Sequence, residues 1–173
     1  MSGSDAAPKA GGGGVGPRHA ARIAAVQALY QCEVGGEPAA LIVEEFAAHR
    51  LDQELDGVTI GRTDREWFTD LVRGAAARMS EIDKLLAGCL DKDRDLARLE
   101  AIMRSCLRAA AFELLARPDV PAKVVINEYV EVARTFFTGN EPAFANGVLD
   151  RLAHQLRPGE LQGTGHGKAR KAD

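Results

Sequence analysis

Three side chains near the start of the chain have the types and spacing to bind phosphate groups. Arg18 and Arg22 are four residues apart, and His19 stands beside the first of them. Residues four apart share one face of a helix, so both guanidinium groups would point the same way. Cations at a helix N-terminus oppose the helix dipole, which makes this cluster mildly unfavourable unless a ligand uses it. The residues alone favour a solvated helix end; the alternative is an anionic partner that supplies phosphate groups, such as RNA.

A second set of basic residues occurs further along the chain. Arg94, Arg98 and Arg108 can lie along one side of a single predicted helix. Arg104 stands close to them, and Lys123 opens the following helix. Basic residues arranged in this way can follow a sugar–phosphate backbone. Three aspartates between positions 91 and 95 offer local salt bridges as the alternative.

Phe144 and Asn140 could contact unpaired bases. Phe144 falls just inside a predicted helix, and stacking of a base on such a ring contributes about 1–3 kcal/mol. A phenylalanine at this helical spacing can also be a core residue, so both interpretations stay open. Asn140 in the preceding loop can donate and accept hydrogen bonds, and we expect it beside the RNA.

No set of residues in the sequence forms a recognisable catalytic or metal site. Gly11, Gly13 and Gly16 fit the pattern G-x-G-x-x-G, but no strand precedes them, so the context that binds a pyrophosphate is missing. Glu128 and Glu131 are one helical turn apart, with no nucleophile or histidine gathered around them. The histidines and cysteines are scattered, without metal-ligand spacing. We expect no enzymatic activity, no cofactor and no metal.

The elements that position these residues are predicted to be helices. Apolar residues recur every three or four positions on both sides of a break at residues 138–140, which is typical of amphipathic helices. These residues are Val125, Tyr129, Val132 and Phe136 before the break, and Phe144, Val148, Leu152 and Leu156 after it. Pro121 suits the first turn of one helix, and Glu141 with Pro142 the start of the next. Gly147 costs about 1 kcal/mol inside a helix relative to alanine, so we expect it to permit close helix packing.

We predict about seven helices, no strand, and two flexible arms. The helices span about residues 18–34, 38–53, 63–79, 80–89, 95–117, 121–138 and 141–157. Thr63 with Glu66, and more weakly Ser80 with Asp83, are the predicted capping boxes. Residues 1–17 are rich in glycine, and residues 158–173 end in a small basic cluster. Both segments lack the large apolar side chains that would offset the entropy of ordering, so we expect disorder there.

Length and composition fit one helical domain. The chain has 173 residues, 46% hydrophobic and 5% aromatic, which is enough for one alanine-rich core but not for two large domains. The formal net charge of −3 neither supports nor excludes RNA binding, because opposite charges can lie on different faces. No apolar run approaches the roughly 18 residues of a membrane span, and no signal peptide is recognised. We expect reduced thiols and a cytoplasmic location.

Three segments of the sequence match the pattern of a known family. The first is Ala25–Tyr30, AVQALY, which follows the basic residues near the start of the chain. The second runs from Cys106–Leu114, CLRAAAFEL, into Arg117–Pro121, RPDVP, and the third and most specific is Lys123–Arg151. Together they resemble the NusB family of bacterial transcription antitermination factors over roughly residues 18–157. The resemblance implies an all-α fold of two small helical sub-bundles that share one interface.

The resemblance also implies a function. NusB proteins bind a boxA-type single-stranded RNA together with NusE, a small-subunit ribosomal protein, in the elongation complex that transcribes ribosomal RNA operons. The RNA-binding residues that it implies here are Arg18, His19, Arg22, Arg108, Lys123, Asn140 and Phe144. Tyr30 and Met103 would lie on the surface that docks NusE. We expect the basic side chains to converge in one groove beside the turn at Gly139.

The sequence departs from the family pattern in three places. Where relatives often carry a run of arginines, this chain has Arg18–Arg22, RHAAR, so affinity for RNA alone is expected to be weak. Many relatives have an acidic residue in the loop where this chain has Asn140, which should repel phosphate less. The glycine-rich arm is an addition without a functional explanation.

Two other functions compete with this interpretation. Similar helical domains occur fused ahead of ribosomal RNA cytosine methyltransferases, but this sequence ends before a catalytic domain could begin. A helical scaffold for protein interactions, or a homodimer that covers its own basic surface, would use the same helices without reading RNA. Light scattering with and without RNA would separate the two: a dimer that dissociates on RNA addition covers its RNA surface, whereas an unaffected dimer favours the scaffold.

Overall fold

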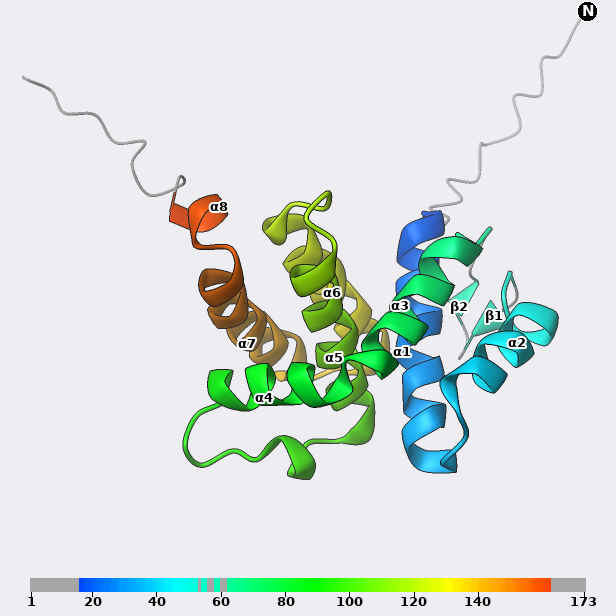
Figure 1. Cartoon of the computed structure of the whole chain (residues 1–173), viewed down its shortest axis with the longest axis horizontal. Helices are drawn as coiled ribbons and strands as arrows, with labels where there is room; N and C mark the ends of the chain where they lie inside the picture. Colours follow the sequence, from blue (N-terminus) through cyan, green and yellow to red (C-terminus); the bar gives the residue numbers. More distant parts are fainter. Residues whose placement is uncertain (1–15, 53, 56–57, 60–61, 163–173) are drawn as a thin grey trace, which may run out of the picture.

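Two groups of helices pack side by side along one shared interface in the computed structural model (Figure 1). The structure describes residues 16–52, 54–55, 58–59 and 62–162. The first group consists of α1 (Pro17–Gly35), α2 (Ala39–His49) and α3 (Arg65–Ala77). The second consists of α4 (Met79–Cys89), α5 (Ala101–Ala116), α6 (Ala122–Phe136), α7 (Glu141–Leu156) and the short α8 (Pro158–Gln162). The predicted all-α fold is confirmed.

Helix α1 is the centre of the shared interface. It is buried without interruption from Ala20 to Leu29, because α2 and α3 cover one side of it and α5 and α6 the other. Five of the ten residues in this stretch are alanines, whose small side chains let neighbouring helices approach closely from several directions. The α5 helix packs on both groups, as expected for the predicted central helix.

The sequence-based helix starts need correction at two places. Asp64, and not Thr63, is the N-cap of α3, and its carboxylate accepts a hydrogen bond from the backbone N–H of Trp67 at 3.0 Å. Helix α4 begins at Met79 without any side-chain cap, so the predicted capping box at Ser80 does not form. A two-residue antiparallel ladder was also not predicted; it pairs β1 (Glu54–Leu55) with β2 (Val58–Thr59).

The predicted helix over residues 95–117 is interrupted. A single 3-10 turn, η1, spans Leu96–Arg98, and Leu99 and Glu100 are extended before α5 begins at Ala101. The side chain of Arg104 fastens this break, because it donates hydrogen bonds to the carbonyl oxygens of Leu96 and Leu99. Arg94 and Arg98 therefore precede α5 and do not continue the line of Arg108.

The close approach of two helices occurs at a different glycine from the one expected. A Cβ atom on Gly147 would meet nothing within 4 Å, so the predicted packing role of this residue is wrong. A Cβ atom on Gly74 of α3 would lie 2.1 Å from the ring of Phe112 on α5. Gly74 is therefore the residue that lets the two helix groups come together.

Carbonyl groups at the C-terminal end of α5 accept hydrogen bonds from a residue that follows α7. The guanidinium of Arg157 donates hydrogen bonds to the carbonyl oxygens of Glu113, Leu114 and Arg117. Glu160 then accepts a hydrogen bond from the backbone N–H of Ala122 at 2.8 Å. Residues 158–162 of the predicted disordered tail thus form α8 against α6 and α7. The rest of that tail and the first 15 residues lie outside the described part of the chain.

Two further findings concern the described residues as a set. None of their helices combines the length and apolarity needed to cross a bilayer. Within the same part of the chain, no three histidine, cysteine, aspartate or glutamate side chains lie close enough to hold a metal ion.

Candidate RNA and partner interfaces

The first predicted basic cluster lines a hollow between the N-terminal ends of α1 and α6. We call it the α1–α6 hollow, and its lining includes Arg18, His19, Arg22, Asp64, Asp119, Pro121, Val124 and Glu128. Lys123 is exposed on the first turn of α6 and directly precedes Val124 in the chain, although it does not itself line the hollow. The hollow therefore brings Arg18, His19 and Arg22 together, with Lys123 on the adjoining turn of α6, and it also contains three carboxylates.

Arg22 is not available to RNA, which corrects the sequence-based expectation. Its side chain is only 4% exposed, and it donates two hydrogen bonds to the fully buried Glu113, at 2.9 and 2.8 Å. Burial by itself would lower the pKa of Arg22, but the hydrogen bonds and negative charge of Glu113 outweigh that effect and leave the pKa raised. The guanidinium is therefore charged and is used inside the fold, where it joins α1 to α5.

His19 lies closer to an acidic partner within the protein than Arg18 does. The Nδ1 atom of His19 lies 2.5 Å from a carboxylate oxygen of Glu128 on α6. Arg18 is 53% exposed, its nearest acid is Asp64 at 3.9 Å, and its guanidinium lies over the ring of Trp67. Arg18 is thus the more accessible of the two.

The second candidate region is a cleft around Phe144, at the turn between α6 and α7. We call it the Phe144 cleft, and it is lined by Arg94, Arg98, Leu99, Glu100, Met103, Phe137, Asn140, Glu141 and Phe144. The guanidinium carbon of Arg94 lies 4.4 Å from the centre of the Phe144 ring. The ring is partly buried against the core, so it has both a packing role and an accessible portion. Asn140 is exposed, and its side chain makes no cap for α7.

Arg108 lies in neither region, although the sequence placed it with the RNA-binding residues. It donates two hydrogen bonds of 2.8 Å to Asp83 on α4, and it lies 3.5 Å from Glu33 on α1. Its side chain is only 13% exposed. Arg108 therefore links three helices and is not free to bind phosphate, which corrects the expectation.

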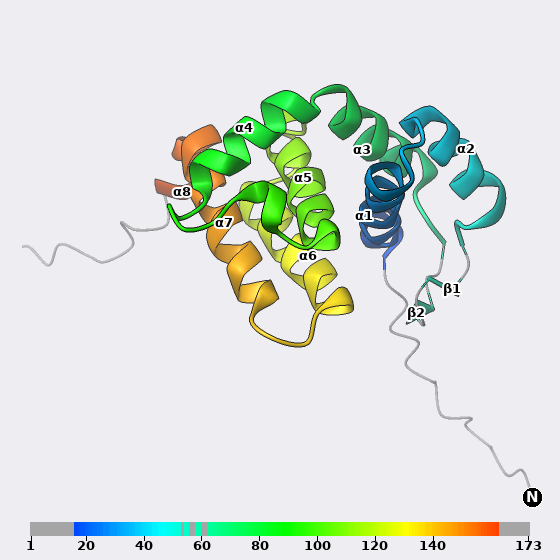
Figure 2. The ribbon, with the colours of Figure 1, turned by 90° about the horizontal axis from the view of Figure 1, so that it is seen from below.

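The structure does not form the single groove that the sequence predicted. Lys123 lies at one end of α6 and Asn140 follows the other end (Figure 2). The 15 residues of α6 separate them by about 22 Å at 1.5 Å per residue. The accessible basic and aromatic groups consequently form two separate regions, one at each end of the same helix.

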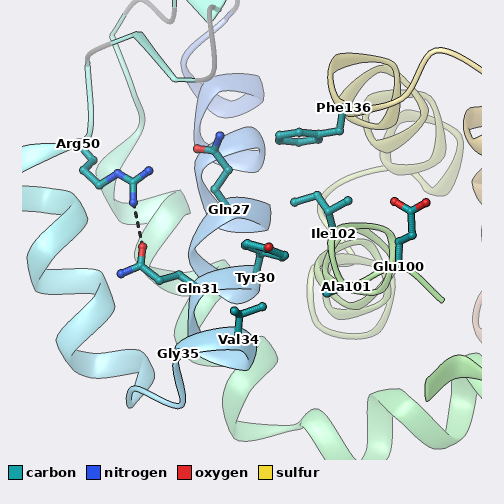
Figure 3. Close-up of a pocket in the computed structure, with 10 residues that line it drawn as sticks. All are labelled: Gln27, Tyr30, Gln31, Val34, Gly35, Arg50, Glu100, Ala101, Ile102 and Phe136. Atoms are coloured by element: carbon teal, nitrogen blue, oxygen red, sulfur yellow. Dashed lines mark hydrogen bonds between the residues drawn. The ribbon is translucent and has the colours of Figure 1, made fainter. Parts of the chain in front are cut away.

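A third surface is an open groove of about 680 Å³ between α1 and the facing ends of α5 and α6 (Figure 3). Tyr30 and Val34 project from α1 toward Ile102 on α5, and Phe136 of α6 lies at the same groove. Tyr30 is 40% exposed and Val34 is 63% exposed, which is high for apolar side chains. The predicted partner residue Tyr30 is thus accessible.

Met103 does not share this groove, which corrects the second partner residue. It is 3% exposed and lies at the base of the Phe144 cleft. The neighbouring Ile102 occupies the position facing Tyr30 (Figure 3). Ile102, and not Met103, therefore shares the groove with Tyr30.

The sequence profile of the NusB family matches residues 19–154 of this chain. The chain belongs to the NusB family. The transcription antitermination protein NusB of Sinorhizobium fredii is 51% identical over 140 residues, which cover 81% of this chain and 88% of that protein. The NusB protein of Agrobacterium fabrum is 50% identical over the same length, with 81% and 85% covered.

Solved NusB structures have the same helical arrangement. The NusB of T. maritima superimposes with a TM-score of 0.67 at 35% identity, covering 81% of this chain and 92% of that one. A crystal structure of the antitermination factors NusB and NusE with double-stranded RNA contains a chain with a TM-score of 0.64 and 24% identity, over 80% and 96% of the two chains. At that identity the second likeness supports the fold alone.

The sequence misplaced two candidate residues and missed a third. Arg94 and Arg98 were predicted to follow a sugar–phosphate backbone from one helix with Arg108, but they lie before α5, are exposed and form no ion pair within the described residues. Trp67 received no role at all, because its contact with Arg18 joins α1 to α3 and leaves no local pattern. Only the arrangement in space identifies them.

Proposed function

We propose that the protein is a transcription antitermination factor that binds a boxA-type single-stranded RNA together with NusE. Family membership supports the antitermination role, because the relatives with about half of their residues identical are antitermination proteins. NusE and RNA are proposed as partners because a NusB of the same fold, at 24% identity, was crystallised with NusE and double-stranded RNA.

The observation that carries the RNA-binding proposal is the composition of the Phe144 cleft. An aromatic ring, an exposed amide and two arginines that form no ion pair with a described residue line this cleft, together with the carboxylates of Glu100 and Glu141. Unpaired bases stack on aromatic rings and on guanidinium planes, and amides read their hydrogen-bonding edges. Arg94 and Arg98 replace Arg22 and Arg108 in the proposed set, beside Arg18, His19, Lys123, Asn140 and Phe144.

Arg94 now covers part of the Phe144 ring, which sets a condition on binding. With 4.4 Å between the guanidinium carbon and the ring centre, a base cannot fit between the two groups. A base that stacks on this face must displace the guanidinium, which is then free to bind a neighbouring phosphate. The α1–α6 hollow supplies the second contact region, where Arg18 and Lys123 would hold the sugar–phosphate backbone.

The groove lined by Tyr30, Val34, Ile102 and Phe136 is the proposed NusE surface. Accessible aromatic and aliphatic side chains beside polar ones are typical of the centre of a protein interface. The proposed role involves binding only and no chemical reaction, and it places the protein in the cytoplasm with the elongation complex.

The direct test is a titration of a labelled boxA-type RNA and a scrambled RNA of equal length, each with and without purified NusE. We expect preference for the boxA-type RNA, and tighter binding when NusE is present. Phe144→Leu should weaken binding of the boxA-type RNA by about fivefold or more, since loss of base stacking costs about 1–3 kcal/mol. Tyr30→Ala should weaken NusE binding and leave RNA binding without NusE unchanged. Equal affinity for both RNAs under all conditions would refute the proposal.

A further inference from the structure

We infer that Trp67 is a positioning residue of the RNA surface, and that it holds the Arg18 guanidinium in place to bind an RNA phosphate. The inference rests on the proposed RNA-binding function and assigns one of its contacts to a specific pair of side chains. Neither the basic pattern at the start of the chain nor the position of Trp67 in α3 indicates this pairing.

The geometry around Trp67 is the first part of the argument. The indole is 4% exposed, and the guanidinium carbons of Arg18 and Arg117 lie 4.1 and 4.2 Å from its ring centre. The guanidinium carbon of Arg22 is 5.6 Å away. Planar guanidinium groups are attracted to the face of an indole, the most favourable ring for this contact. The Trp67 ring is therefore surrounded by three arginine side chains, two from α1 and one from the end of α5.

The three arginines differ in what else they bind. Arg22 is paired with Glu113, and Arg117 donates hydrogen bonds to Asp119 and Asp70. Arg18 donates no hydrogen bond to any residue that the structure describes; it forms one long ion pair, 3.9 Å from its Nε atom to Asp64, and Asp119 lies in the same hollow. Arg18 alone combines a stacked guanidinium with N–H donors that are free to bind a ligand.

This combination suits a phosphodiester. A phosphate accepts two parallel hydrogen bonds from one guanidinium, and the planar group retains these donors when its face lies on a ring. A free arginine loses rotamer entropy on binding, whereas a stacked side chain is already partly ordered. Three carboxylates also line the α1–α6 hollow, so net charge alone would attract RNA only weakly there. The fixed direction of the Arg18 donors is what makes a phosphate contact at this place effective.

The test compares substitutions that keep or remove the stack while RNA binding is measured without NusE. Arg18→Lys keeps the charge and loses the planar group, so we expect roughly two- to fivefold weaker binding, the effect of one exposed guanidinium–ring contact, and an unchanged salt dependence. Trp67→Leu should weaken binding similarly. Trp67→Phe keeps an aromatic face and removes no hydrogen bond to a described residue, so it should retain affinity within about twofold.

The salt dependence of binding tests the charge of Arg18. Arg18→Ala should weaken RNA binding and reduce the slope of log K against log salt by about 0.7.

Arg50→Lys is the matched control. The guanidinium of Arg50 lies 4.4 Å from the ring centre of Phe46, so the same substitution breaks a similar stack outside both RNA regions. RNA affinity should not change in this variant. Trp67 is the only tryptophan of the chain, so its fluorescence should change on RNA addition in the wild type, and not in Arg18→Ala.

The outcomes separate this inference from the proposed function. Phosphate contacts carry no sequence information, so the effects of Arg18 and Trp67 substitutions should be equal for boxA-type and scrambled RNA. Wild-type affinity in Arg18→Lys would overturn the inference even if Trp67→Leu were weakened by misfolding, because Arg18→Lys leaves the core intact. Unchanged tryptophan emission at saturating RNA would overturn it as well. A wild type that does not prefer the boxA-type RNA would instead overturn the proposed function.

Discussion

Arg22 stabilises the packing of α1 on α5 through its pair with Glu113, although its position in the sequence suggested RNA binding. Two hydrogen bonds connect side chains that are 91 residues apart, and Glu113 has no exposed surface. An ionised carboxylate in such a place is stable only while its partner stays in position. Arg22 therefore fixes the register of α1 against α5, and so the placement of Arg18 one turn earlier.

Substitution of Arg22 by methionine should be strongly destabilising. Arg22→Met leaves the buried Glu113 without its partner, and we expect the free energy of unfolding in urea to fall by about 3–5 kcal/mol. The double variant Arg22→Met/Glu113→Leu should recover most of this loss, because no unpaired charge remains. Arg134→Met is the control, since the Arg134–Glu131 pair is exposed and is worth at most about 1 kcal/mol. A double variant no more stable than Arg22→Met would contradict this account.

The sequence identified basic residues correctly by type but could not give their exposure. Arg18 and Lys123 are accessible as predicted, whereas Arg22 and Arg108 are held by acids on other helices. The partner of Arg108 lies 25 residues away and that of Arg22 much further, so neither pairing has a local sequence signal. The exposure of each arginine depends on how the helices pack, and a short stretch of sequence does not show this.

At the scale of the elements, two glycines inside helices have opposite surroundings. Gly74 faces the ring of Phe112 at the contact between α3 and α5. Gly147 is exposed on α7 with open space around the position of a Cβ atom. Both glycines lower helix stability because glycine loses more conformational entropy on folding, but only Gly74 allows a close packing contact between helices.

The same substitution at these two glycines should therefore have opposite effects. Gly74→Ala must displace Phe112, and overpacking of this kind costs about 1–3 kcal/mol. Gly147→Ala should raise the free energy of unfolding by up to about 1 kcal/mol, because alanine is the better helix former. Urea or thermal unfolding of both variants measures this difference. A destabilised Gly147→Ala would show that this position does have a packing or backbone requirement.

The periodicity of apolar residues predicted the helices well because amphipathic faces are a local property. The stripe of Val125, Tyr129 and Val132 is buried on α6 as expected. The break before α5 was not predictable in this way, since Leu99, Ile102 and Met103 keep a helical spacing across it. The break is held by the side chain of Arg104, which binds backbone carbonyls of the preceding turn. Hydrogen bonds from one side chain to the backbone accompany this boundary, and the spacing of apolar residues does not reveal them.

At the scale of the whole molecule, internal pairing determines where positive charge is available. Within the described residues, the arginines that connect helices are paired with acids, including Arg22, Arg104, Arg108 and Arg117. Arg18 and Lys123 at the α1–α6 hollow and Arg94 and Arg98 at the Phe144 cleft are exposed instead. With a formal net charge of −3, the chain has no general attraction for RNA. Binding must therefore depend on these two regions and on the protein partner.

The salt dependence of RNA binding distinguishes this charge distribution from the one expected from sequence. Each cation that contacts single-stranded RNA contributes about 0.7 to the slope of log K against log salt. Arg94→Gln/Arg98→Gln should thus reduce the slope by about 1.4 and weaken binding, whereas Arg108→Gln should leave the slope unchanged because its charge is already neutralised by Asp83. Arg73→Gln/Arg78→Gln, which line neither RNA region, remove the same charge as a control. Circular dichroism confirms that each variant is folded before titration. A reduced slope in Arg108→Gln, with no change in the Arg94/Arg98 variant, would show that RNA contacts α5 at Arg108 and not the Phe144 cleft.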